Sequence, residues 1–236
     1  MNQIQLVPEN KDVLNKMMLL YPSPAETKTY HPINHADLIS SVLNNIKRDF
    51  VSGEAQFDRT GQKMVAKLRY AIPNLPEFLY TVAVGNSYNK TMPVKLASGL
   101  SVMACLNMQV HGDINYFRKH TPLVWDGIIP AIAAINDNID EDIEKGYYDS
   151  KYMQSIKLQD RNAWKILGTM YGKKIINNKV MNTGYREWEA PSFDGLEDKT
   201  MWRLYNGLTY GMQDASPIHA LEMQKNVHDY FVGAKA

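Results

Sequence analysis

The side chains best suited to binding chemistry lie between Gly85 and Thr121, in the sequence GNSYNKTMPVKLASGLSVMACLNMQVHGDINYFRKHT. Polar and cationic groups alternate there with glycines and a short apolar run, which is typical of a backbone folded tightly around a polar or anionic partner. Arg118, Lys119 and His120 form a compact cationic cluster before a predicted helix, where free N–H groups favour a phosphate. The candidate binding residues of this stretch are Asn86, Tyr88, Lys90, Lys95, Arg118, Lys119 and His120.

A second cationic group is predicted on a neighbouring strand. Side chains alternate between the two faces of a strand, so QKMVAKLRYAI places an apolar set on one face and Lys63, Lys67 and Arg69 on the other. The two groups together predict a basic groove that follows a phosphate backbone, with Tyr88 stacking a base and Tyr116 or Phe117 as further rings. The alternative is that these cations are ordinary exposed charges, or pair with the carboxylates of Glu77, Asp113 and Asp126.

Most catalytic and metal chemistry is excluded by residue type or spacing. One cysteine and six dispersed histidines do not supply a zinc site, and phosphate-loop, dinucleotide-binding and nucleophile-elbow motifs are absent. The run DNIDEDIE lacks the glycine and ligand spacing of a calcium loop, which favours a solvated helix face. We therefore predict no cofactor and no metal, and favour a non-enzymatic role. A hydrolase using His120 with Asp113 or Asp126 stays as an alternative.

Composition sets the outer limits of these interpretations. The chain has 236 residues, of which 44% are hydrophobic and 22% charged, so it can bury a core. The net charge of +1 excludes a long-range attraction of the whole protein for nucleic acid, so any such affinity needs a local basic patch. The absence of a long apolar run, of a secretory signal and of a second cysteine beside Cys105 favours a reducing cytoplasm and no membrane span.

The pattern of apolar residues and turn signals predicts an α+β fold that positions the candidate site. Asn34 caps a helix with helical spacing to Phe50, and DRTG joins strands 51–57 and 62–72 into a hairpin. We expect a strand over 78–88, a helical turn over 94–99 and a buried strand over 102–107. Thr121 caps a helix with Pro122 at its first position and a kink at Pro130, and further helices follow over 151–171, 200–212 and 218–232, with a loop over 177–199.

The predicted organisation has three parts in one compact unit. Residues 1–34 form a leader segment with a short helix at LNKMMLL, 35–121 form an α+β core of the nucleic-acid-binding kind, and 122–236 form a helical half packed on that core. In the helical half, YREWEAPSF and MWRLYNGLTYGM form a second group of interest. Trp202, Tyr205 and Leu208 have the spacing of core residues, while Glu187 and Glu189 are expected to pair with Arg186 or Arg203.

The central stretch resembles the motif of the phage and plasmid-like proteins classed as domain of unknown function 932. That motif has a polar turn, a small-residue run, an apolar run ending in C-x-N and a basic K-H-T, and HPINHADLISSV, REWEAP and WRLYNGLTYGM resemble other segments of the family. The matching motif positions are Asn86, Ser87, Lys90, Gly99, Cys105, Asn107, Lys119, His120 and Thr121. Gly85 and Asn89 depart from it, since family members often carry arginine and aspartate there, and this weakens a catalytic role.

The resemblance implies an origin in a mobile element and a place in the cytoplasm of a host cell. The order of helix, hairpin, strand and helix is also similar to the core of phage single-strand annealing proteins, which assemble into rings and hold DNA in a basic groove. The sequence therefore predicts a phage-derived, homo-oligomeric protein that binds single-stranded DNA and anneals it for recombination. The alternative is a phage structural protein, or one that interacts with and inhibits a host factor.

Overall fold

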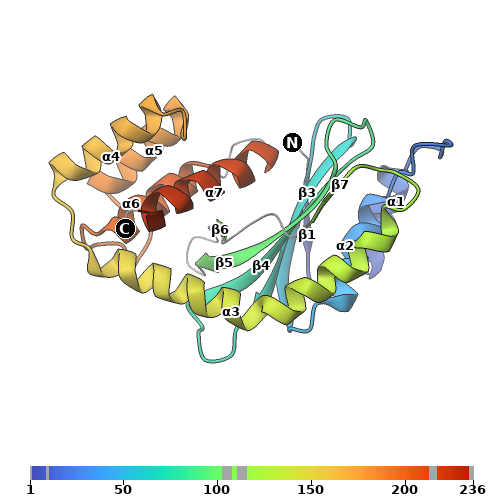
Figure 1. The fold of residues 1–236 in the computed structure, drawn as a ribbon, viewed down its shortest axis with the longest axis horizontal. Helices are drawn as coiled ribbons and strands as arrows, with labels where there is room; N and C mark the ends of the chain where they lie inside the picture. Colours follow the sequence, from blue (N-terminus) through green and yellow to red (C-terminus); the bar gives the residue numbers. More distant parts are fainter. Residues whose placement is uncertain (1, 9–10, 103–107, 111–115, 213–216, 234–236) are drawn as a thin grey trace. The chain divides into compact units, whose positions relative to one another are not determined.

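The computed structural model describes residues 2–8, 11–102, 108–110, 116–212 and 217–233, and its fold is α+β as predicted, with an antiparallel sheet followed by helices (Figure 1). The strands are β1 (Asn2–Leu6), β2 (Phe50–Phe57), β3 (Lys63–Ala71), β4 (Phe78–Ser87), β5 (Val94–Val102), β6 (Met108–Val110) and β7 (Tyr116–Arg118). The helices are α1 (Lys11–Leu20), α2 (His35–Asn45), a 3-10 turn η1 (Trp125–Gly127), α3 (Ile128–Ser155), α4 (Asp160–Gly172), α5 (Asn178–Glu189), α6 (Met201–Gly211) and α7 (Pro217–Gly233).

The strands follow each other in the sheet in the order β1 to β6, and β7 pairs with β5. The predicted hairpin of β2 and β3 is confirmed, with Glu54 directly opposite Lys67. Its turn is stabilised by the side chain of Asp58, which accepts hydrogen bonds from the N–H groups of Gln62 and Lys63 at 2.8 and 3.2 Å. Gly61 completes the turn at a φ of +69°, a conformation that residues with a side chain rarely adopt.

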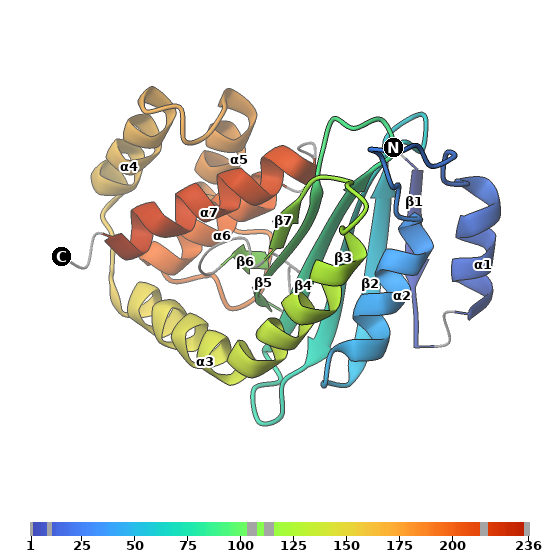
Figure 2. The same cartoon turned by 45° about the vertical axis from the view of Figure 1, so that its right-hand side comes forward.

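Helices cover one face of the sheet in Figure 2, where α2 and the start of α3 lie in front of the strands and α1 lies at the right edge. The side chain of Asn34 caps α2 as predicted, accepting a hydrogen bond from the N–H of Ala36 at 2.9 Å. The apolar stripe of α2 contacts β3 and β4. The face of β3 predicted as core is confirmed, because its side chains are fully buried; they are Met64, Ala66, Leu68 and Tyr70.

Several local predictions are wrong because pairing or packing overrides local sequence preference. The helix predicted to extend to Phe50 ends at Asn45, and Phe50 begins strand β2. The single helix predicted over 151–171 is the end of α3 and most of α4, separated by residues 156–159. Residues 94–99 belong to strand β5 and not to a helical turn, since β5 pairs with β6 and β7. The predicted loop 177–199 contains helix α5, and the leader contains strand β1, which pairs with β2. The helix predicted from Thr121 begins as η1 and continues as α3, which holds Pro130 in its first turn, where no N–H is needed. The predicted strand 102–107 lies, except for its first residue, outside the described residues.

The chain divides into two compact units at positions that differ from the expected boundary at residue 121. The first unit comprises residues 1–98 and 113–140, and the second comprises 99–112 and 141–236. The boundaries therefore fall inside β5 and inside α3. The first unit holds all ten residues predicted to bind nucleic acid.

In the second unit, α5 and α6 approach each other closely through glycines. A Cβ atom added to Gly207 would lie 2.7 Å from the Cβ of Glu187, and one added to Gly184 would lie 2.8 Å from a methyl carbon of Leu208. Both distances are shorter than a van der Waals contact. The two helices can therefore lie this close only because neither position carries a side chain.

Candidate functional site

Asn86 is the centre of a buried polar network that joins the leader to strand β4. Its side chain is fully buried. The amide nitrogen donates to the carbonyl of Ile33 at 2.7 Å and to Nδ1 of His35 at 3.0 Å, while the amide oxygen accepts from Nε2 of His120 at 2.7 Å. These bonds use both hydrogens of the amide nitrogen and one acceptor position of the amide oxygen. Asn86 therefore holds the structure together and does not present its amide to a ligand.

Tyr88 is also part of this interior and not an exposed stacking platform. Its hydroxyl accepts from the N–H of His35 at 3.0 Å and donates to the carbonyl of Tyr21 at 3.1 Å. Its ring stacks on the imidazole of His35 with centroids 3.9 Å apart, and the residue is 9% exposed. The hydroxyl of Tyr30 donates to the Tyr88 carbonyl at 2.7 Å. The expected contact of Tyr88 with a base would require this packing to open.

The two histidines of the network are neutral near pH 7. Burial lowers the pKa of His35 to about 4, although the carbonyl of Gly61 and the charge of Asp58 act in the opposite direction. The geometry requires the neutral ring, because Nε2 donates to the carbonyl of Gly61 at 3.1 Å while Nδ1 accepts from Asn86. Burial also lowers the pKa of His120. This shift favours the neutral form of His120 and so reduces its expected contribution of positive charge to the cationic cluster.

The predicted cationic row of β3 lies on the face of the sheet opposite to α2, and its members differ in accessibility. Arg69 is 4% exposed and its guanidinium is paired with Glu54 at 2.6 Å. Lys67 is half-buried directly opposite Glu54, and burial lowers the pKa of its ammonium group. Lys63 is half-buried at the start of the strand. Glu54 thus offsets part of this charge, and Arg69 is withdrawn from solvent.

Lys95 and Phe117 extend the same face. A Cβ atom on Gly85, which pairs with Val65 on this face, would lie 3.5 Å from the Cβ of Lys95. Lys95 and Phe117 are directly opposite each other in the β5–β7 pair. The Lys95 ammonium lies 5.4 Å from the centroid of the Phe117 ring, a cation–π arrangement. Lys95 is buried, while Phe117 is 60% exposed, so this ring is the accessible aromatic surface of the face.

A cavity of about 490 Å³ brings the accessible members of the predicted site together. Phe117 forms part of its wall, and the exposed cations Lys90 and Lys119 line it. The Lys90 ammonium lies 4.5 Å from the ring centroid of Tyr30, and Lys90 has a φ of +60° at the tip of the β4–β5 connection. The remaining lining residues are Thr29, Thr91, Met92, Pro93, His120 and Thr121. Cations, hydroxyls and one exposed ring are the groups that bind a phosphate and a base.

Arg118 is exposed, but its side chain lies outside this cavity. Its guanidinium forms a hydrogen bond with the hydroxyl of Tyr116, and that hydroxyl donates to the carbonyl of Val124 at 2.8 Å. The ring of Tyr116 is thereby fixed against Gly127, whose added Cβ would lie 2.7 Å from the hydroxyl oxygen. Tyr116 was considered above as a further stacking ring, but its side chain instead connects β7 to the segment around η1.

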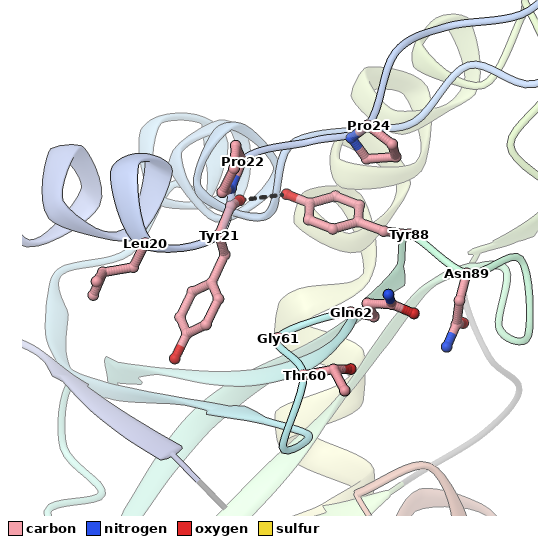
Figure 3. Close-up of a pocket in the computed structure, with 9 residues that line it drawn as sticks. All are labelled: Leu20, Tyr21, Pro22, Pro24, Thr60, Gly61, Gln62, Tyr88 and Asn89. Atoms are coloured by element: carbon pink, nitrogen blue, oxygen red, sulfur yellow. Dashed lines mark hydrogen bonds between the residues drawn. The ribbon is translucent and has the colours of Figure 1, made fainter.

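A second cavity of about 460 Å³ is lined in part by Tyr88 (Figure 3). It lies between the end of α1, the β2–β3 turn and the residues after β4, and the dashed line in Figure 3 marks the bond from Tyr88 to the carbonyl of Tyr21. The lining residues are Leu20, Tyr21, Pro22, Pro24, Thr60, Gly61, Gln62, Tyr88 and Asn89. None of these side chains is charged. This cavity therefore lacks the groups that would neutralise a phosphate.

The described residues give little support to acid–base chemistry at His120. Its Nε2 is engaged with Asn86, the carboxylate of Asp126 belongs to an exposed residue, and Asp113 lies outside the described residues. Within the described ranges, no three His, Cys, Asp or Glu side chains are grouped in a way that could hold a metal ion. The DNIDEDIE run lies on α3, and its two isoleucines are buried while its acidic groups face outward or are half-buried, as predicted for a solvated helix face.

The second group of interest is a packing core in the second unit. Trp202, Tyr205 and Leu208 are buried as predicted. Arg203 donates to the backbone carbonyls of Glu187, Trp188 and Glu197 at 2.5 to 3.2 Å, while the Glu187 carboxylate accepts from Ser192. The expected pairing of Arg203 with a carboxylate is therefore replaced, at hydrogen-bond distance, by bonds to the backbone.

The leader residues Thr29 and Tyr30 line the cationic cavity, although the sequence prediction placed the site wholly within the core. Thr29 and Tyr30 lie more than fifty residues from Lys90 in the chain. The leader reaches the cavity because the N–H of His31 donates to the carbonyl of His120 at 3.1 Å. The Tyr30 side chain adds a hydrogen bond to the Tyr88 carbonyl and lies under the Lys90 ammonium. No periodicity or motif in the leader signals these contacts, since they depend on distant partners.

No family model, no curated protein and no solved structure matches this chain. The resemblance to the phage and plasmid-like family therefore stays a prediction. In the parts of the chain that the structure describes, no helix has a stretch long and apolar enough to cross a bilayer.

Proposed function

We propose that this protein binds single-stranded nucleic acid at the cationic cavity of its first unit. The observation that carries the proposal is the exposed ring of Phe117, which lines one cavity together with Lys90 and Lys119 and has the Lys95 ammonium 5.4 Å from its centroid. Single-strand binding combines cations that follow the phosphates with rings on which bases stack. Both kinds of group lie within or against one cavity of about 490 Å³.

The cavity has the size and groups for a nucleotide unit. Small-molecule sites are typically about 300 to 1,000 Å³, so one nucleotide of a strand is accommodated while its neighbours stay outside. Phe117 takes the stacking role first assigned to Tyr88, because its ring is exposed and already polarised by Lys95. Lys90, in the connection between β4 and β5, and Lys119, directly after β7, bind the flanking phosphates. Lys63 and Lys67 extend the positive face along β3, partly offset by Glu54.

A charge-reversal experiment tests the assignment. Anisotropy of a labelled oligothymidine is measured with the Lys90→Glu/Lys119→Glu variant and with a control, Lys145→Glu/Lys151→Glu, which makes the same charge change on exposed residues of α3. We expect at least tenfold weaker binding for the first variant only. Two lost phosphate contacts should also reduce the slope of log affinity against log salt by about 1.4. Equal effects of the two variants, or no binding even at low salt, would reject the proposal.

Replacing Phe117 separates stacking from charge. Phe117→Ala should weaken binding about 5- to 150-fold, the range of one lost base stack, whereas Phe117→Tyr should keep the affinity within about twofold. Both changes leave the net charge unaltered. Equal affinity of the alanine and tyrosine variants would remove Phe117 from the site.

We further propose that binding leads to annealing by an oligomer of this chain in the cytoplasm of a host cell. The first unit has helix α2, the β2–β3 hairpin and strand β4 in the expected order, with β5 and β7 before helix α3, and this partial likeness supports the extension by analogy. It is tested by the rate at which complementary strands pair in the presence of the protein, and by light scattering with and without single-stranded DNA. If the protein stays a monomer and binds DNA without accelerating strand pairing, the annealing proposal is rejected and only the binding function remains.

A second candidate function is the interaction with a phage or host protein. It is favoured by three apolar side chains exposed near the start of α3, Leu123, Trp125 and Ile129, with exposed fractions of 57%, 39% and 47%. Affinity purification from host lysate with and without nuclease separates the two functions. A stoichiometric partner that survives nuclease and is lost in Leu123→Ser/Ile129→Ser would favour this second role.

A further inference from the structure

The hairpin of helices α4 and α5 in the second unit carries a concentration of positive charge that the net charge of the chain conceals. From Arg161 to Arg186 the sequence contains six Lys and Arg residues and no Asp or Glu. The whole chain has 26 Lys and Arg against 25 Asp and Glu, so the remaining residues carry 20 cations against 25 anions. The six cations are Arg161, Lys165, Lys173, Lys174, Lys179 and Arg186, and all are exposed.

Two of the three acidic groups that flank this segment are engaged elsewhere. Asp160, at the start of α4, accepts hydrogen bonds from Lys199 at 2.5 Å and from the indole of Trp188 at 3.0 Å. The carboxylate of Glu187, near the end of α5, is buried and accepts two hydrogen bonds from Ser192. The third flanking acid, Glu189 at the end of α5, is exposed and offsets one of the six positive charges.

Three large aromatic side chains are exposed on the same hairpin. Trp164 and Tyr171 on α4 and Tyr185 on α5 each have an exposed fraction of 47%. Trp164 and Tyr171 are seven residues apart, so they share one side of α4 and are separated by about 10.5 Å along its axis. Figures 1 and 2 both show α4 and α5 side by side, and the two helices contact each other.

These features differ from those of a helix that binds a membrane surface. Such a helix inserts a continuous apolar face between lipids. The apolar residues of α4, Ala163, Leu167 and Met170, are buried inside the second unit. The exposed side instead alternates cations with aromatic rings, which is the pattern that binds phosphates and the faces of unpaired bases.

We propose that the exposed surface of α4 and α5 is a second binding surface for single-stranded nucleic acid. It uses residues that are separate from the cavity of the first unit and rests on the proposed function only for the class of ligand. Arg161 and Lys165 bind phosphates, and bases stack on the rings of Trp164 and Tyr171. Duplex DNA offers the phosphates but keeps its base faces stacked internally, so the exposed rings select the single strand.

The test uses the full chain and a labelled oligothymidine of about 30 nucleotides. Arg161→Glu/Lys165→Glu is compared with the same control as above, Lys145→Glu/Lys151→Glu, which makes an equal charge change within the second unit. We expect at least tenfold weaker binding and a salt slope reduced by about 1.4 for the first variant only. Trp164→Ala should weaken binding at least about fivefold. Circular dichroism verifies that each variant is folded.

The outcomes distinguish the two surfaces. Loss of affinity only in the Lys90→Glu/Lys119→Glu variant would overturn the second surface and leave the proposed function intact. Loss of affinity only in the Arg161→Glu/Lys165→Glu variant would support the surface of α4 and α5 and reject the cavity of the first unit as the binding site. Equal affinity for a duplex of the same length would overturn the role of the rings. Binding of polyglutamate but not of any oligonucleotide would overturn the proposal in favour of an acidic protein partner.

Discussion

Removal of one oxygen atom from the buried network should measurably destabilise the first unit. The Tyr88 hydroxyl accepts the N–H of His35 and donates to the carbonyl of Tyr21, and Tyr88→Phe leaves both without this partner. A buried unsatisfied group costs about 1 to 3 kcal/mol. His35 is fully buried while Tyr21 is half-buried and can bind water, so we expect a loss near about 2 kcal/mol, dominated by the His35 N–H.

Urea denaturation followed by circular dichroism measures this loss, and hydrogen exchange of peptides covering the start of α2 locates it. A loss of this size should lower the melting temperature by about 4 to 8 °C for a chain of this length. Tyr148→Phe is the control, because Tyr148 is 61% exposed and should change stability by less than about 0.5 kcal/mol. A Tyr88→Phe variant as stable as this control, with unchanged exchange at His35, would refute the reasoning.

Two further predictions concern the interior of each unit. The pKa of His35, about 4, lies below its ordinary value because the ring is buried. Its contribution to stability is therefore complete above about pH 6.5 and falls by about 3 kcal/mol as the pH drops from there to about 4. An NMR titration of labelled histidine that gives His35 a pKa near 6.5 would contradict this. Gly207→Ala should cost about 2 kcal/mol or more in urea denaturation, because its new methyl group would meet Glu187 at 2.7 Å. Gly168→Ala is the matched control on α4, since nothing lies within 4 Å of its added Cβ, and it should be neutral or stabilising by up to about 1 kcal/mol. Equal destabilisation by both alanines would show that backbone preference and not contact decides the result.

Local sequence signals were sufficient wherever an element is specified by its own residues. Asn34 starts α2 because a cap needs only a side-chain oxygen and the next N–H groups. The DRTG turn closes the β2–β3 hairpin because Asp58 bonds the backbone a few residues ahead. Alternation along β3 predicted the buried face of Met64 and Leu68 correctly. These interactions act over a few residues, so they can be read from the order of amino acids.

Elements and roles that depend on distant partners could not be read in this way. Strand β5 looks like a helical turn over 94–99 until β6 and β7 pair with it. Helix α5 is rich in residues typical of loops, but Gly184 lets it pack closely on α6. The sequence placed Tyr88 and Asn86 among the ligand-binding groups because both side chains are polar. Tertiary structure used them instead to join the leader to β4.

The sequence by itself determined the α+β class, the positions of α2, α6 and α7, and the concentration of binding-type residues between Gly85 and Thr121. Tertiary structure decided which of those residues can meet a ligand. Asn86, Tyr88 and His120 are turned inward because a buried polar group must find partners. Asn86 and His120 bond each other, and the Tyr88 hydroxyl bonds the N–H of His35. Phe117 and Lys119 are left exposed at a cavity. Accessibility depends on how distant segments pack, and residue order alone does not contain it.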